Sequence, residues 1–169
     1  MVATWSWVTF WLILHVLGVI IAFGPNFANP FIGILIAKHP QHAVFAVEVQ
    51  ETVSKRLTIP LGVVVAASGT GLIYSLHIPL WSTPWLIGAI VLYAAAYLFG
   101  VFVQFPTGMK LLRLLQSMPP GPPPAGATGP PPEVAALAKR LRLGGTYLLG
   151  SVVVIAILMM WQPGKHVFG

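Results

Sequence analysis

The residue best placed to do chemistry is His15, which lies in a stretch from Met1 to Ala37 without Lys, Arg, Asp or Glu. A charge-free stretch of this length is typical of a membrane-spanning helix, so we expect His15 to lie inside the bilayer, one turn after Trp11. A neutral imidazole is the commonest metal ligand and an axial ligand of haem iron. Two interpretations stay open: a hydrogen bond to a carbonyl or tyrosine across the helices, or coordination of haem or a metal.

The other four histidines are weaker candidates. His77 and His166 fall near the ends of predicted spans, close in the pattern to Met159 and Met160. Imidazole and thioether together are ligands that copper accepts, but this spacing defines no site, so we expect histidines at the membrane interface. His39 and His42 fall in a connection between spans, where we expect them to be solvated.

Several kinds of chemistry have no support in the sequence. The chain has no cysteine, which excludes disulfides, thiolate metal sites and cysteine nucleophiles. No phosphate-binding loop, hydrolase triad or zinc motif is present. The predicted spans contain no Asp, Glu, Lys or Arg, whereas ion-coupled transporters usually bury such a group. We therefore name no catalytic residue, and a non-catalytic role is favoured over an enzyme.

The elements that must position His15 follow from composition. Of the 169 residues, 57% are hydrophobic and 7% are charged, against roughly a quarter charged in a soluble domain. Because a helix needs about 20 apolar residues to cross a bilayer, the charge-free stretches predict four spans. The fold class is thus an all-α four-helix membrane bundle in a single domain, 1–169, with spans at about 5–37 (kinked near Gly24–Pro30), 57–77, 84–104 and 143–162.

The basic residues predict the orientation of these spans. The connection from Lys38 to Arg56 holds three Lys or Arg, and the connection from Gln104 to Arg142 holds five of the nine in the chain. Cytoplasmic loops carry an excess of Lys and Arg, so both connections are expected in the cytoplasm and both termini outside. The net charge of +6 is explained by this topology, and we expect no nucleic acid partner.

The two basic connections differ in composition. Lys38 to Arg56 is predicted to be an amphipathic helix that extends the second span along the membrane surface, with Glu51 and Lys55 paired four residues apart. Residues 118–132 form a Pro-rich cytoplasmic linker, for which a rigid polyproline spacer is favoured over a docking motif. Within the spans, small residues recur every four positions, as at Gly62, Ala66 and Thr70, and favour close helix packing.

A family resemblance rests on the first span. The segment Leu14-His15-Val16-Leu17-Gly18, followed by Gly24 and Pro30, resembles that span in uncharacterised bacterial integral membrane proteins related to copper-resistance protein D and the J-type protoporphyrinogen oxidase. The four-span layout with a basic first loop is similar over most of the chain. The resemblance implies a small helical bundle in the bacterial inner membrane, and haem associated with His15.

These observations lead to one functional hypothesis with two rivals. The favoured hypothesis is a small bacterial membrane protein that binds a cofactor, with haem on His15 as the candidate, or a partner. One rival is an accessory subunit of a larger respiratory or photosynthetic membrane complex, docked on other membrane subunits or on a second copy. The other is a porphyrin-type redox enzyme or a copper-handling protein. In each case the lipid bilayer is the expected surrounding partner.

Overall fold

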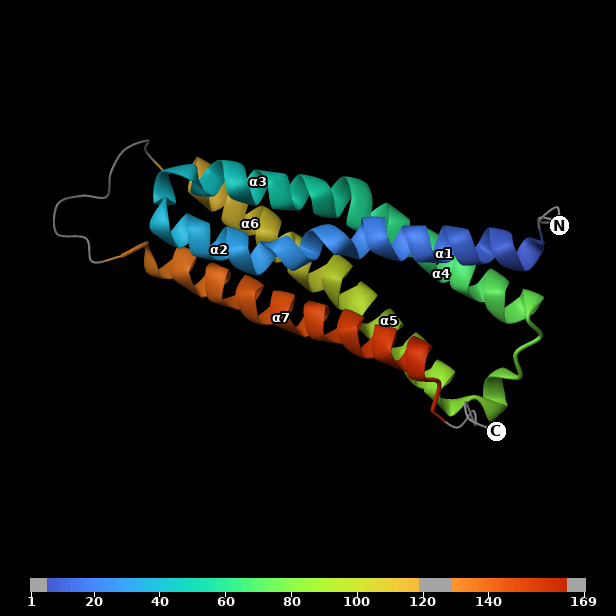
Figure 1. The fold of residues 1–169 in the computed structure, drawn as a ribbon. Helices are drawn as coiled ribbons and strands as arrows, with labels where there is room; N and C mark the ends of the chain where they lie inside the picture. The colour runs from blue at the N-terminus through green and yellow to red at the C-terminus, as the bar shows by residue number, and fades with distance from the viewer. Residues whose placement is uncertain (1–5, 119–128, 164–169) are drawn as a thin grey trace.

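The computed structural model describes residues 6–118 and 129–163, and these residues form helices and turns without a strand (Figure 1). The helices, in chain order, are α1 (Trp7–Phe23), η1 (Gly24–Ala28), α2 (Asn29–Lys38), η2 (Pro40–His42), α3 (Ala43–Val53), η3 (Ser54–Thr58), α4 (Ile59–Ser75), η4 (Leu80–Ser82), α5 (Pro84–Phe99), η5 (Gly100–Gln104), α6 (Phe105–Gln116) and α7 (Pro132–Trp161). The predicted Pro-rich linker falls mostly on residues 119–128, which lie outside the described residues, as do Lys165 and His166.

Four long apolar segments run through these elements. They are Trp7–Lys38, Pro40–Ser75, Pro84–Gln116 and Pro132–Trp161, each long and apolar enough to cross a membrane. The prediction of an all-α protein with four membrane-spanning helices is confirmed. At about 1.5 Å per residue, segments of 30 to 36 residues measure roughly 45 to 54 Å, which exceeds a hydrocarbon core of about 30 Å. The segments are therefore long enough to cross the hydrocarbon core and also extend beyond it.

Three of the long segments change their helical winding next to a proline. The 3₁₀ turn η1 precedes Pro30, and the π-helical turns η3 and η5 precede Pro60 and Pro106. A proline inside a helix lacks an N–H and its ring clashes with the carbonyl four residues earlier. Local rewinding relieves this clash while the helix continues, which is why the first segment bends near Gly24 without ending there.

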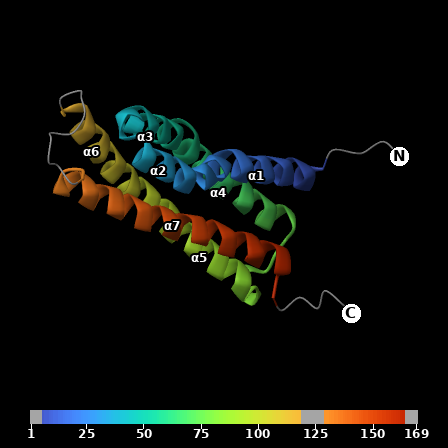
Figure 2. The same cartoon turned by 60° about the vertical axis from the view of Figure 1, so that its left-hand side comes forward.

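The helices pack as pairs. α1 lies along α4, α5 along α7, and α3 along α6. Figures 1 and 2 show the pairs α1/α4 and α5/α7 diverging toward the end that carries the termini, while the helices stay together at the other end. Two tyrosines of α5 join the pairs: Tyr93 donates a hydrogen bond to the carbonyl of Gly62 (2.6 Å) and Tyr97 to that of Ile59 (2.8 Å).

The end with the α2–α3 turn forms a helical extension where the sequence predicts mainly a connection. Residues Gln104 to Arg142 were expected mainly as a connection, yet α6 continues to Gln116 and α7 begins at Pro132. α3 is helical as predicted, but it continues α4 through η3 and packs on α6 instead of lying alone on a membrane surface. The extension has its own apolar core, made of Val47, Leu111, Leu112, Val134 and Leu137.

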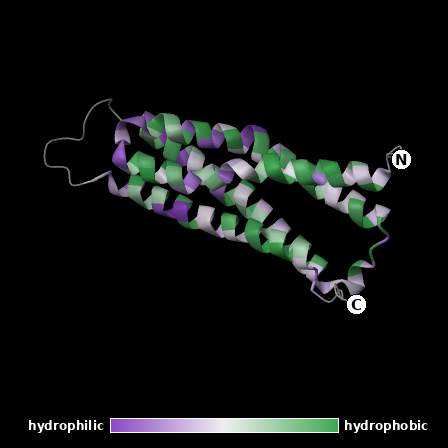
Figure 3. Cartoon of the chain, viewed as in Figure 1, coloured by the Kyte–Doolittle hydropathy of each residue, from purple (hydrophilic) through white to green (hydrophobic). Residues whose placement is uncertain are grey.

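Hydrophilic residues gather on this extension. Figure 3 shows them concentrated toward the α2–α3 turn and the adjacent ends of α6 and α7, whereas the opposite part of the bundle is mostly hydrophobic. Lys55 and Arg56 are exposed in η3, where α3 joins α4. Lys110 forms an exposed ion pair of 3.3 Å with Glu133. Exposed pairs of this kind contribute little to stability, so the apolar core holds the extension together.

The orientation of the bundle is a testable prediction. Reporter fusions in the segment from Lys38 to Arg56 and near Gly121 are expected to report a cytoplasmic location. The reason is that eight cations flank that end of the spans. A fusion between Ser75 and Pro84 is the matched control and should report the opposite side. Protease access to the Lys38–Arg56 segment from outside sealed cells would contradict this orientation.

Candidate functional site

His15 lies at the seam between α1 and α4. Two bulky side chains of α1, Trp11 and His15, face α4, where each lies against a glycine. A Cβ added to Gly69 would lie 3.2 Å from Cε1 of His15, and one added to Gly71 would lie 2.7 Å from Cε2 of the Trp11 indole. Gly18 is similarly close-packed, since its added Cβ would lie 3.0 Å from a methyl of Val65. Small residues at this seam let two bulky rings fit between closely spaced helices.

Two hydrogen bonds fix the imidazole of His15. Its Nδ1 lies 3.0 Å from the carbonyl oxygen of Val65 and 3.2 Å from Oγ of Ser68. A carbonyl oxygen can only accept, so Nδ1 carries the proton and donates it. Ser68 is fully buried and gives its own proton to the carbonyl of Val64 (2.8 Å), which leaves Oγ free to accept from His15. In the neutral ring, Nε2 is then the nitrogen with the free lone pair.

This arrangement combines both interpretations of His15. The predicted hydrogen bond to a carbonyl across the helices is present. The same bond is the one that orients a metal-ligating histidine, because such residues usually donate their second ring nitrogen to a carbonyl or carboxylate. The ring is half-buried, and its neighbours Leu12 and Val16 expose apolar side chains. The site can therefore hold a hydrogen-bond donor, or a metal ion, on Nε2.

Most of the other polar groups in the spans bind backbone or one another. Thr58 donates to the carbonyl of Ala22 (2.9 Å), and Gln104 donates to that of Leu141 (2.8 Å). Gln50 donates to Asn29 (3.1 Å), which joins α3 to α2. Within lipid each polar group needs such a partner, so these bonds are structural contributions to the bundle.

Glu51 does not follow its predicted pairing. The ion pair found among the described residues is Lys110–Glu133, and the Glu51 carboxylate instead lies against Gly108 of α6. Its Oε2 is buried and has no hydrogen-bond partner within the described residues. The packing of α3 on α6 outweighs a solvent-exposed pair with Lys55, since such pairs on a helix gain only about 0.2–0.5 kcal/mol.

The remaining predicted ligands do not gather around His15. His77 follows α4 and is exposed, with a positive φ of 50°. Met160 is exposed at the end of α7, and His166 lies outside the described residues. Among residues 6–118 and 129–163, no three His, Cys, Asp or Glu come close enough to hold one metal ion. His39 and His42 are exposed, as expected, but lie close to each other.

These features define the class of protein: a multi-pass, all-helical integral membrane protein with an oriented histidine between two of its spans. More specifically, the chain belongs to the family described as "Predicted integral membrane protein (DUF2269)", whose model matches residues 9–163. The expected membership of an integral membrane protein family is thus confirmed. The match gives no evidence for a relation to copper-resistance protein D or the J-type oxidase. No curated protein and no solved structure matches the chain.

Proposed function

We propose that this membrane protein binds haem, with Nε2 of His15 as an axial ligand of the iron. The observation that supports the proposal is the hydrogen bond from Nδ1–H of His15 to the carbonyl of Val65, at 3.0 Å. It holds the ring in one tautomer and one orientation, and it leaves the lone pair of Nε2 to bind the iron. An imidazole supported in this way is a better ligand than a free one, because the hydrogen bond at Nδ1 raises the basicity of Nε2.

The residues around His15 fit a haem in their chemistry. A single proximal histidine is sufficient to hold haem iron, so a second ligand is not required. Leu12 and Val16 expose 49% and 46% of their surfaces beside it, which suits an apolar macrocycle. A bound haem would supply electron-transfer or gas-binding chemistry. The residues of this chain would bind the iron, through His15, and keep the ring oriented, through Val65 and Ser68.

Absorption spectra of the purified protein test the proposal. The wild-type protein, supplied with haem, is expected to show a Soret band that His15→Ala abolishes. His15→Asn is the matched variant, because its amide N–H can still donate to Val65 while it lacks the imidazole. We expect His15→Asn to lose the Soret band but keep most of the stability, since such bonds contribute about 0.6 kcal/mol in a membrane bundle. His77→Ala should keep the band.

Other outcomes would overturn the proposal. A colourless wild-type protein that shows no spectral shift with excess haem would exclude haem binding. A Soret band that persists in His15→Asn, with helical content unchanged, would place any haem on another residue. Either result would leave His15 as a packing residue that joins α1 to α4.

A second candidate function, an accessory subunit of a larger membrane complex, is supported by a different observation. The extension beyond Lys55 and Arg56 exposes large apolar side chains of α2 and α3, namely Phe31, Ile34, Leu35 and Phe45. Exposed apolar groups next to a polar, cationic region are typical of interaction surfaces. Purification in a mild detergent from the native membrane would favour this role if defined membrane subunits remain attached in fixed ratio to a colourless protein.

A further inference from the structure

The turn between α2 and α3 brings two histidines to the same side of the chain. His39 ends α2, η2 covers Pro40–His42, and α3 begins at Ala43. The backbone N–H of His42 donates to the carbonyl of His39 at 3.0 Å, and the ring of Pro40 restricts its own φ. His39 itself precedes the 3₁₀ helix, with an extended-type φ of −132°. The backbone bond between His42 and His39 closes the turn and keeps the two residues near each other.

The separation of the two rings is suitable for one metal ion. Their centroids lie 6.5 Å apart, with an angle of 50° between the planes. An ion about 2.0–2.1 Å from one nitrogen of each ring would place the centroids roughly 5 to 6.5 Å apart, from tetrahedral to linear coordination. The observed distance is at the upper end of this range. Both side chains are exposed, so a small rotation about their χ angles can bring the nitrogens to one ion.

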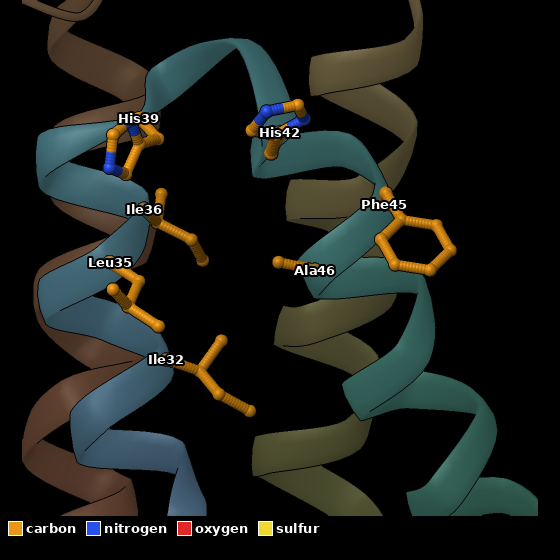
Figure 4. Close-up of a pocket in the computed structure, with 7 residues that line it drawn as sticks. All are labelled: Ile32, Leu35, Ile36, His39, His42, Phe45 and Ala46. Carbon is orange, nitrogen blue, oxygen red and sulfur yellow. The ribbon is translucent and has the colours of Figure 1, made fainter.

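The side chains near the two histidines favour some metal ions over others. The carbon atoms of both imidazoles, and not their nitrogens, line a groove of about 250 Å³ together with apolar side chains (Figure 4): Ile32, Leu35, Ile36, Phe45 and Ala46. The groove offers no carboxylate, and Lys38 precedes His39 in the chain. Hard cations such as Mg²⁺ and Ca²⁺ need oxygen ligands and are disfavoured here. Imidazole nitrogen prefers Zn²⁺, Ni²⁺ and copper.

We propose that His39 and His42 form a two-histidine binding site for a divalent transition-metal ion at the predicted cytoplasmic end of the bundle. The protein supplies two nitrogen ligands, and water or an external donor completes the coordination. An incompletely coordinated ion of this kind exchanges readily, so the site suits transient binding more than permanent structural binding. The proposal is independent of the role of His15, which lies in the α1–α4 seam.

Binding of Cu²⁺ tests the proposal, because divalent copper binds nitrogen sites most strongly in the first-row series. Protein without a polyhistidine tag would be titrated in detergent by calorimetry, and its electron paramagnetic resonance spectrum would report nitrogen ligands. We expect one equivalent to bind, with affinity reduced about tenfold or more by His39→Ala or His42→Ala, at least the loss seen for supporting groups. Mg²⁺ should not bind, and binding should weaken as the pH falls because protons compete for the imidazoles.

His77→Ala is the matched control, since His77 is also exposed but follows α4 at the opposite end of the bundle. It should leave the affinity unchanged. The single His39 and His42 variants should melt like the wild-type protein without metal, because both side chains are exposed. Equal Cu²⁺ affinity in the wild-type protein and the double His39→Ala/His42→Ala variant would overturn the proposal. A spectrum without nitrogen ligands would overturn it as well.

Discussion

Gly62→Ala is expected to destabilise the bundle strongly, because the new methyl group would collide with the ring of Tyr97. A Cβ at this position would lie 2.8 Å from Cδ2 of Tyr97 and closer still to Cε2. The ring cannot easily move away, since its hydroxyl donates to the carbonyl of Ile59 and it stacks on Tyr93 at a centroid distance of 6.0 Å. Overpacking of this kind costs about 1–3 kcal/mol. Displacing the ring would also weaken the hydrogen bonds from the two tyrosines that join α5 to α4.

Thermal unfolding in detergent, followed by circular dichroism, measures the effect. Gly88→Ala is the matched control: it lies in the same helix as Tyr97, and an added Cβ would have nothing within 4 Å. We expect Gly88→Ala to melt at the wild-type temperature or above, because alanine is the better helix former. If Gly62→Ala melts like Gly88→Ala, the close packing of α4 and α5 at Gly62 is wrong.

Gly108→Ala is expected to loosen the extension of the bundle. The added Cβ would overlap with the carboxylate of Glu51, whose Oε2 is already buried without a partner. The methyl group would push α6 away from α3, next to the apolar core that contains Val47 and Leu111. We expect a loss of about 1–3 kcal/mol, with faster amide hydrogen exchange in α3 and α6 and little change in α1 and α4.

A double-mutant cycle separates this contact from a general effect of alanine. Glu51→Ala removes the obstructing carboxylate, so the pair Glu51→Ala/Gly108→Ala should recover most of the stability that Gly108→Ala loses. Gly150→Ala, in α7 with no atom near an added Cβ, should leave exchange in α3 and α6 unchanged. A loss that is the same with and without Glu51 would show that the carboxylate is not what Gly108 accommodates.

The functional tests are linked to these structural ones. His15 contacts α4 through Val65 and Ser68, on the seam whose other close contact is Trp11 over Gly71. A bound haem would therefore depend on α1 and α4 staying paired. The metal site proposed at His39 and His42 depends only on the η2 turn, so the two tests can fail separately.

The sequence by itself determined the number of spans and the position of the histidine within them. Charge-free stretches decide whether a segment can enter lipid, and this depends on local composition alone. The pattern also placed His15 one turn after Trp11, and both side chains do face α4. The amphipathic character of residues 105–116, where Leu111 and Leu112 are buried between charged residues, is a local signal of the extension in the sequence.

Only the tertiary structure decided what each of these residues contacts. His15 donates to the carbonyl of Val65, 50 residues away, and a backbone carbonyl leaves no mark in the sequence. Glu51 turns to Gly108 instead of Lys55, because helix packing competes with a weak local ion pair. His39 and His42 come together at the turn after α2, where the backbone N–H of His42 donates to the carbonyl of His39. Local composition decides whether a segment lies in lipid or in water. The contacts of each residue depend instead on which helices lie side by side and how each helix is rotated.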